Sequence, residues 1–262
     1  MIELLPEQVE ALRQLQRAYQ DAGVDAVIIG ATAYRVWIDD DRRTQDVDVA
    51  VAVDVDQLTP LTDRLKAAEW TQDPRREERW LTRSGARIDL LPIGEQARRA
   101  GHVTWPKAEM RMSVAGFEHV FAEAVEKELA PETVMKVVPL HVLALLKIVV
   151  YMDDPHGRTK DLEDLGRLME QYELEGDRRF GDEVFEAGAD FESAGAFLLG
   201  LDVGRLCTAS EAKIVGALIT VLQDDNNAAQ RLLGRRNADE QTVEERRKRA
   251  EAFAGGFVRG QG

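Results

Sequence analysis

The feature that most constrains the fold of this chain is an alternating stretch that begins at Asp46. From position 46 to position 53 the residues read DVDVAVAV, so that valines alternate with aspartates and then with alanines. Alternation with a period of two, carried by β-branched residues, predicts a strand whose successive side chains point to opposite faces. Asp46 and Asp48 therefore lie on one face, with their Cα atoms about 7 Å apart.

Two carboxylates held this close need a cationic partner, because like charges on one strand face repel each other. A divalent metal is the natural candidate, since hard cations such as Mg²⁺ take oxygen ligands and keep phosphate oxygens in their coordination shell. An acidic alternating strand is, however, more often a solvated edge than a metal site. The sequence just upstream decides between these two interpretations.

A phosphate-binding turn is predicted directly ahead of this strand. Val27–Ile29 reads as a buried strand, Gly30, Ala31 and Thr32 as a turn of small residues, and positions 33–38 as a short helix. A small-residue turn that opens a helix offers free backbone N–H groups and the positive end of the helix dipole to a phosphate. Followed by the Asp-x-Asp strand, it predicts a site for a nucleotide and a metal.

These residues resemble the first motif of the nucleotidyltransferases of the DNA polymerase β superfamily: Gly30-Ala31, then Arg42-x-Thr44-x-Asp46-x-Asp48. Within that superfamily the chain most resembles the AbiEii-like branch, the abortive-infection toxins of type IV toxin–antitoxin systems, over about residues 24 to 170. One position departs from the pattern, because Ala31 stands where the family usually has Gly or Ser. Ala31 keeps the tight turn but loses a hydroxyl contact to the triphosphate, which Thr32 could replace.

A third carboxylate is predicted on the next strands. Positions 79–82 and 87–91 read as two strands around the turn at 84–85. Asp89 stands between Ile88 and Leu90 and so points to the face opposite them. The resemblance implies that Asp89 completes the site, where a carboxylate can bind the metal or accept the proton of the attacking hydroxyl. A solvated strand residue is the alternative.

Lys147 lies within a nearly apolar helix that begins at Pro139 and should be buried. A buried ammonium is costly without an anionic partner, unless its stem reaches the surface. The family pattern has such a lysine, then a charged loop, then Lys-Asp-Leu-x-Asp-Leu, which positions 160–165 match. The resemblance implies that Lys147 contacts the nucleotide phosphates and that Asp161 belongs to the site. Asp161 would also suit the first turn of a helix as a dipole partner.

A basic segment follows the Asp89 strand. Positions 96–113 hold four cations against the single acid Glu109, in a chain of net charge −14: Arg98, Arg99, Lys107 and Arg111. A solvated loop is the simpler interpretation. The more specific one is a positively charged surface that binds a phosphate-rich acceptor beside the site. The overall charge argues against a general nucleic-acid coating protein.

The rest of the chain predicts mainly helices. A helix over 6–22 should end at Gly23, and others are expected at 122–129, 191–206, 212–222 and 240–253, with a small strand near 117–120 and a frayed tail over 254–262. Cys207 is the only cysteine, so an internal disulfide and a cysteine-based zinc site are excluded. With no secretory signal or membrane-spanning segment visible, the expected location is the cytoplasm.

The predicted fold is α+β, with a nucleotidyltransferase domain over 1–125 containing a small mixed sheet and a helical domain over 126–262. The predicted reaction moves a nucleoside monophosphate from a nucleoside triphosphate to an acceptor hydroxyl. Asp46, Asp48 and Asp89 would hold Mg²⁺ or Mn²⁺, Gly30–Thr32 would bind the triphosphate, and Arg42 would anchor its loop or reach a phosphate.

The acceptor and partners stay open. The resemblance to the toxins implies an RNA such as tRNA, or a protein, as acceptor, and a cognate antitoxin as partner. A small-molecule acceptor such as an antibiotic is one alternative, and a catalytically silent relative that binds a nucleotide or a partner protein is another. Ala31 favours the silent relative, whereas the intact carboxylate set and Lys147 argue against it.

Overall fold

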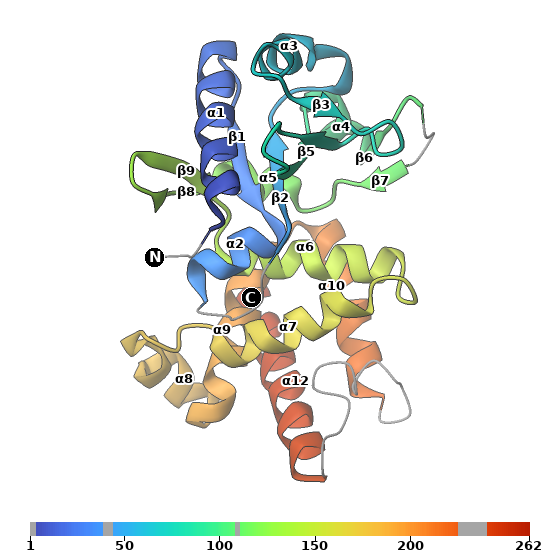
Figure 1. Ribbon diagram of the computed structural model, residues 1–262. Coiled ribbons are helices and arrows are strands. Elements are labelled where there is room, and N and C mark those ends of the chain that lie inside the picture. Colours follow the sequence, from blue (N-terminus) through green and yellow to red (C-terminus); the bar gives the residue numbers. More distant parts are fainter. Residues whose placement is uncertain (1–3, 39–43, 108–110, 225–239) are drawn as a thin grey trace. The chain divides into compact units, whose positions relative to one another are not determined.

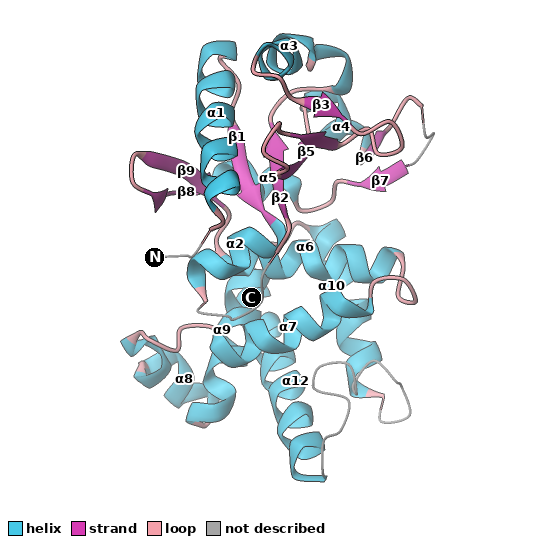
Figure 2. Cartoon of the chain, in the orientation of Figure 1, coloured by secondary structure: helices cyan, strands magenta, loops and turns pink. Residues whose placement is uncertain are grey.

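The computed structural model describes residues 4–38, 44–107, 111–224 and 240–262, with the backbone alone for 240–243. Arg42, predicted to anchor its loop or reach a phosphate, lies outside these residues. The chain forms two compact units, residues 1–139 and 140–262 (Figure 1). The described strands all belong to the first unit, and the second is built from helices (Figure 2). The fold is therefore α+β, as the sequence predicts.

A mixed seven-stranded sheet forms the centre of the first unit. Its spatial order is β3 (Thr71–Gln72), β4 (Arg79–Leu81), β5 (Arg87–Pro92), β2 (Asp46–Val51), β1 (Ala26–Ile29), β9 (Thr133–Val137) and β8 (Val125–Ala130). The pairs β2–β5 and β1–β9 are parallel, while β1–β2 and the outer pairs are antiparallel. The central strands β5, β2 and β1 thus carry the sequence motifs side by side.

Helices pack around this sheet. They are α1 (Pro6–Ala22), α2 (Gly30–Trp37), α3 (Thr59–Ala67), α4 (Glu95–Ala100) and α5 (Phe117–Ala122), with a 3₁₀ turn at Val55–Gln57 and a small β6 (His102–Thr104)–β7 (Arg111–Ser113) ribbon. Helix α1 packs against α3 and β9, and α2 packs against β1 and β2. Gly23 ends α1 in the left-handed conformation, at φ 65°, which glycine adopts without strain. The prediction for this helix is confirmed at both ends.

The alternation that begins at Asp46 is confirmed as the β2 strand. Val47, Val49 and Val51 are fully buried, and Ile88 and Leu90 of the adjoining β5 are buried with them. Each such side chain contributes about 1.5–3 kcal/mol by leaving water, so this face of the sheet is fixed by its valines. A one-residue slip of either strand would expose all of them, so the opposite face is fixed as well.

The second unit contains α6 (Leu140–Asp153), α7 (Thr159–Gln171), a 3₁₀ turn at Asp177–Phe180, α8 (Asp182–Ala187), α9 (Phe191–Leu206), α10 (Ala209–Gln223) and α12 (Glu240–Gln261). Helices α9 and α12 pack against each other through glycines. A Cβ atom added at Gly200 would lie 2.1 Å from the Phe253 carbonyl oxygen, and one at Gly256 would lie 2.0 Å from that of Phe197. The two backbones are therefore in direct contact, which only glycine permits.

In none of the ranges described above does a helix combine the length and apolar character needed to cross a membrane.

Two local predictions around residue 120 are wrong. The predicted strand near 117–120 is the helix α5, and the predicted helix over 122–129 is mostly the strand β8. The charged side chains that suggested a helix belong to the outermost strand of the sheet, where Glu126 pairs in register with Lys136. Charges of opposite sign across two strands stabilise the pair, and charge on an edge strand prevents further pairing.

The prediction that residues 254–262 are frayed is also wrong. Helix α12 continues to Gln261, and Phe253, Ala254 and Phe257 are buried in it. Glycine lowers helix propensity, which is why the tail reads as frayed. Here the missing side chains allow close packing against α9, and that packing stabilises the helix.

Candidate active site

Three carboxylates share one face of the central sheet. Asp46 and Asp48 alternate with the buried valines of β2, and Asp48 is the register partner of Asp89 on the parallel strand β5. Neighbouring strands lie about 4.8 Å apart, so the carboxylates of Asp48 and Asp89 are close neighbours. Two negative charges at about 5 Å repel by about 3 kcal/mol at an effective dielectric constant of about 20. The site therefore strongly favours positive charge.

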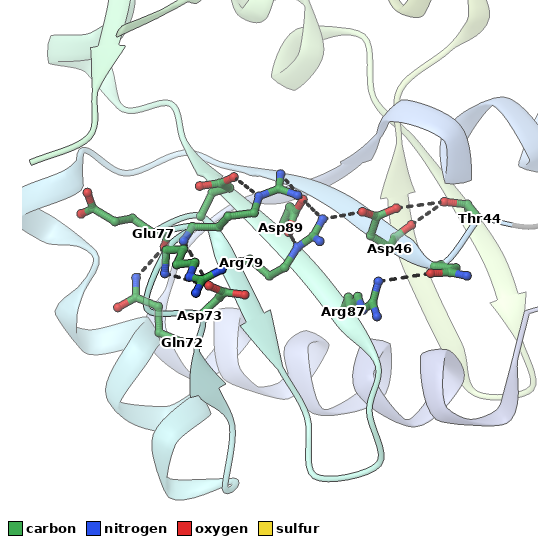
Figure 3. A network of polar contacts seen from close by, with 12 residues as sticks. Thr44, Asp46, Gln72, Asp73, Glu77, Arg79, Arg87 and Asp89 are labelled. Atoms are coloured by element: carbon green, nitrogen blue, oxygen red, sulfur yellow. Dashed lines mark hydrogen bonds and ion pairs between the residues drawn. The ribbon is translucent and has the colours of Figure 1, made fainter. Parts of the chain in front are cut away.

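The guanidinium of Arg79 supplies that charge (Figure 3). Its Nη2 donates to Asp46 Oδ2 at 2.5 Å and to Asp89 Oδ2 at 2.8 Å, and its Nε donates to Asp89 Oδ1 at 2.7 Å. Arg79 is the register partner of Asp89 across the antiparallel pair β4–β5, so the backbone aligns the two side chains. The hydrogen bonds that Arg79 donates to Asp89 raise the pKa of Arg79 above its ordinary value, and burial opposes this only partly. The guanidinium stays charged at every accessible pH.

A second arginine joins the buried end of this network. Arg76 Nη2 lies 3.4 Å from Asp89 Oδ2, and Arg76 Nε donates to Glu78 Oε1 at 2.8 Å. The side chain of Asp89 is only 6% exposed, whereas that of Asp46 is 37% exposed. A buried carboxylate is tolerated only with partners, so Arg79 and Arg76 are what allow Asp89 to sit so deep.

The glycine at the start of α2 contacts the carboxylate of Asp48. Gly30 has φ 64°, and a Cβ atom added there would lie 2.1 Å from Asp48 Oδ2. Its neighbour Ile29 is the register partner of Asp48 across β1–β2, which brings the start of the helix over the carboxylate. Thus the predicted phosphate-binding turn and the Asp-x-Asp strand meet in the fold, although α2 begins directly at Gly30 without a separate turn.

Two threonine hydroxyl groups lie near the site, on Thr32 and Thr44. Thr32 is fully buried, and its Oγ1 has no hydrogen-bond partner among the described residues. The Thr44 hydroxyl donates to the backbone oxygen of Asp46 at 2.8 Å, which is local turn chemistry. The donors that this turn offers are therefore its backbone N–H groups rather than a side-chain hydroxyl.

The carboxylate set suits a divalent cation in its chemistry, since Asp46, Asp48 and Asp89 offer the hard oxygen donors that Mg²⁺ and Mn²⁺ prefer. The guanidinium of Arg79 occupies the place of a cation among these carboxylates, since it contacts Asp46 and Asp89. No group of three or more ionisable ligands in the described part of the chain is arranged to hold a metal ion. A metal thus fits this set only where Arg79 withdraws, since it needs oxygens that the guanidinium now contacts.

Lys147 and Asp161 lie together in the second unit. Lys147 Nζ donates to Asp161 Oδ1 at 2.8 Å and to Asp164 Oδ2 at 2.6 Å, and Arg158 Nε lies 2.8 Å from Asp161 Oδ2. Burial lowers the pKa of Lys147, but the charges of Asp164 and Asp161 and their hydrogen bonds outweigh it, so the pKa lies above its ordinary value. The lysine is thus a largely buried ammonium, with its side chain 12% exposed, that is paired with two carboxylates.

The four cations of the basic segment are not equivalent. Arg98 is held by its own unit, since Nη1 donates to the Ile93 carbonyl at 2.8 Å and Nε lies 2.9 Å from a Glu118 carboxylate oxygen. Arg99 is exposed and pairs with Glu95 one turn back on α4. Arg111 and Lys107 are exposed and flank residues outside the described ranges, which include Glu109. Of the four predicted residues, three are therefore exposed, and one of these, Arg111, places Nη2 3.0 Å from His102 Nδ1.

The structure brings the predicted residues into two groups, one in each unit. Gly30 joins the carboxylates in the first unit, and Asp161 joins Lys147 in the second. Two participants were not predicted from the sequence. Asp164 follows Asp161 by three residues, so helical spacing places both on one face. Arg79 and Asp89 each lie five residues from Ser84, within the predicted turn, so a hairpin centred on Ser84 pairs them.

Comparisons with solved structures find distant likenesses. JHP933 from Helicobacter pylori is 16% identical over 97% of this chain and 95% of that one, with a TM-score of 0.40. A putative nucleotidyltransferase from H. pylori is 17% identical over 97% and 98% of the two chains, with a TM-score of 0.40. ANT(2")-Ia in complex with adenylyl-2"-tobramycin is 12% identical over 61% and 86%, with a TM-score of 0.40.

A comparison with curated protein sequences finds no match. The model of one protein family matches residues 13–261, and it is described as nucleotidyl transferase AbiEii toxin, type IV TA system. That range includes both units, with the carboxylates of the first and the lysine group of the second. The chain therefore belongs to the AbiEii family of nucleotidyl transferases.

Proposed function

We propose that this chain transfers a nucleoside monophosphate from a nucleoside triphosphate to an acceptor hydroxyl and releases pyrophosphate. The observation that carries the proposal is the meeting of Asp48, Asp89 and Asp46 on one sheet face with the glycine start of α2. Membership of the AbiEii family supports the reaction class. We place this reaction in the cytoplasm. In this proposal the chain is a toxin, and its partner is a cognate antitoxin.

In this proposal the backbone of Gly30, Ala31 and Thr32 binds the triphosphate through N–H groups at the start of α2. Asp89, the most buried of the three carboxylates, completes the metal-binding set or accepts the proton of the attacking hydroxyl. When Mg²⁺ or Mn²⁺ is held by the three carboxylates, it would neutralise the negative charge that grows on the pyrophosphate leaving group.

Lys147 is the proposed cation for the phosphates from the second unit. Asp161 and Asp164 keep its ammonium charged and fix its direction, so they are positioning residues in this scheme. Arg42 is proposed to anchor its loop or to contact a phosphate. Arginine and lysine at such positions balance charge in the transition state of phosphoryl transfer.

The experiment that tests the proposal is incubation of the purified chain with each labelled nucleoside triphosphate, Mg²⁺ or Mn²⁺, and total RNA or protein. The native chain should transfer label, and the Asp46→Asn/Asp48→Asn variant should fall to background. Asp63→Asn, an exposed carboxylate on α3 in the same unit, is the matched control and should retain activity. Full transfer by the double variant would refute the assignment.

The acceptor is proposed to be an RNA, such as tRNA, bound by the exposed cations Arg99, Lys107 and Arg111. Each phosphate contact changes the slope of log affinity against log salt by about 0.7 for a single strand. Replacing the three by Gln should flatten that slope and raise KM for RNA while nucleotide binding stays unchanged. A protein or a small-molecule acceptor is the alternative. If the acceptor is a small molecule, the turnover rate should be unaffected by the three substitutions.

A further inference from the structure

A single guanidinium contacts both ends of the carboxylate set. Arg79 binds Asp89 through two parallel hydrogen bonds, at 2.7 and 2.8 Å, and reaches Asp46 with the same Nη2 atom. This fork geometry matches carboxylates and phosphates equally well. It also engages both oxygens of Asp89 and the Oδ2 oxygen of Asp46.

We propose that Arg79 is the internal counter-ion of this site, that a divalent cation must displace it from Asp46 and Asp89, and that the displaced guanidinium moves to the phosphates of the nucleotide. The last step rests on the proposed function, whereas the competition for the carboxylates does not. The guanidinium and the divalent cation cannot bind the same carboxylate oxygens together, because the two positive charges repel each other and each takes oxygens that the other needs.

The backbone of Arg79 is held in place independently of its side chain. Its N–H donates to the Arg76 carbonyl at 2.9 Å, and its own carbonyl accepts from Asp73 N–H at 2.9 Å. The next residue, Trp80, is buried at 2% exposure and fixes β4. The displacement that we propose is therefore a movement of the side chain, with the strand left in place. Arg76 remains beside Asp89 after the movement and covers part of its charge.

The exchange makes metal and nucleotide depend on each other. Without nucleotide, a metal gains the carboxylates but leaves Arg79 without a partner. With nucleotide, the phosphates replace the carboxylates as partners of the guanidinium. The nucleotide should therefore raise metal affinity, and the metal should raise nucleotide affinity by the same factor, since coupling is reciprocal.

The test is a titration with Mn²⁺, followed by electron paramagnetic resonance, on the native full chain and on Arg79→Met. Arg87→Met is the matched control, because it removes the same charge at the register partner of Asp46, where Arg87 contacts Gln45. Each protein is titrated alone and with α,β-methylene analogues of the four nucleoside triphosphates, which cannot react.

Arg79→Met should bind Mn²⁺ about tenfold more tightly than the native chain without nucleotide, within the range usual for coupled sites. The analogue should raise Mn²⁺ affinity about tenfold in the native chain and much less in Arg79→Met. The Arg87→Met control should behave as the native chain does. If Arg79 has only a structural role, Arg79→Met should bind Mn²⁺ more weakly than the native chain, because the carboxylates would lose their fixed positions.

Equal Mn²⁺ affinity of the native chain and Arg79→Met would overturn the proposal, as would an analogue effect of the same size in both. Failure of the proposed function looks different: no analogue would bind any of the proteins, while the Mn²⁺ comparison without nucleotide would still identify the counter-ion. If Arg79→Met does not fold, Arg79→Lys replaces it, because lysine keeps the charge but cannot bind Asp89 through two parallel bonds. It should give an intermediate gain in Mn²⁺ affinity, and a native-like affinity would overturn the proposal.

Discussion

The contact between Gly30 and Asp48 can be measured with two alanine substitutions that differ in a single respect. Gly30 and Gly23 have nearly the same positive φ, 64° and 65°. A Cβ atom at Gly23 would meet nothing within 4 Å, whereas one at Gly30 would lie 2.1 Å from Asp48 Oδ2. Gly23→Ala therefore reports the backbone strain alone, and Gly30→Ala reports the same strain plus the displaced carboxylate.

The expected magnitudes follow from these two contributions. A non-glycine residue in the left-handed region costs about 1–2 kcal/mol, part of which the stiffer unfolded chain returns, so Gly23→Ala should lose about 1 kcal/mol. Crowding a packed site costs about 1–3 kcal/mol more, so Gly30→Ala should lose about 2–4 kcal/mol. In an Asp48→Ala background most of this excess should disappear, because interacting sites do not add.

The assay is urea unfolding followed by tryptophan fluorescence. The tryptophans of the chain all lie in the first unit, so this signal reports the unit that carries the substitutions: Trp37, Trp70, Trp80 and Trp105. A change in midpoint at constant slope gives the change in unfolding free energy. Equal losses for Gly30→Ala and Gly23→Ala would refute the contact between the glycine and the carboxylate.

Four further predictions concern the second unit. Gly256→Ala should lose about 1–3 kcal/mol in urea unfolding followed by circular dichroism, because its Cβ would meet the α9 backbone, whereas Gly255→Ala, with open space, should gain up to about 1 kcal/mol. Lys147→Met should lose about 3–5 kcal/mol in the same assay, since the buried Asp161 and Asp164 each lose an ion pair although Asp161 keeps Arg158, and unchanged stability would contradict the pairing. Burial raises the pKa of Cys207 to about 12, so this thiol should react with a disulfide reagent more slowly in the native chain than in urea. Because the folded chain holds that proton more tightly, this group should lower stability as pH rises from about 9 towards 12.

The sheet face of the carboxylates could be predicted because strand alternation is a local property. Val47 and Val49 need the core, so Asp46 and Asp48 must face the other way whatever the rest of the chain does. The role of Arg79 could not be predicted in the same way. Its register with Asp89 requires a hairpin centred on Ser84, which the predicted turn at 84–85 does not define, and its choice of Asp46 as a second partner depends on β2 lying beside β5.

The charged strand and the glycine-rich tail were misjudged for related reasons. In both cases the composition of the segment indicates how it would behave alone, whereas its structure depends on packing or pairing with another element of the chain. Strand β8 is stabilised by pairing with β9, and α12 is stabilised by close packing against the backbone of α9 at Gly200 and Gly204, which carry no side chain. Lys147 is the converse case, since burial of its ammonium requires an anionic partner, and Asp161 was already part of the same motif.

The packing of α12 on α9 has a consequence for synthesis on the ribosome. The N-terminus leaves the ribosome first, so the first unit can fold once β9 has been synthesised and can pair with β1. Helix α9, in contrast, has its packing partner α12 only after residues 240–261 have been synthesised. During that interval the apolar, glycine-lined side of α9 has no partner and is open to chaperones and proteases. We therefore expect ribosome-stalled chains that end before residue 240 to carry a protease-resistant first unit and a protease-sensitive second one.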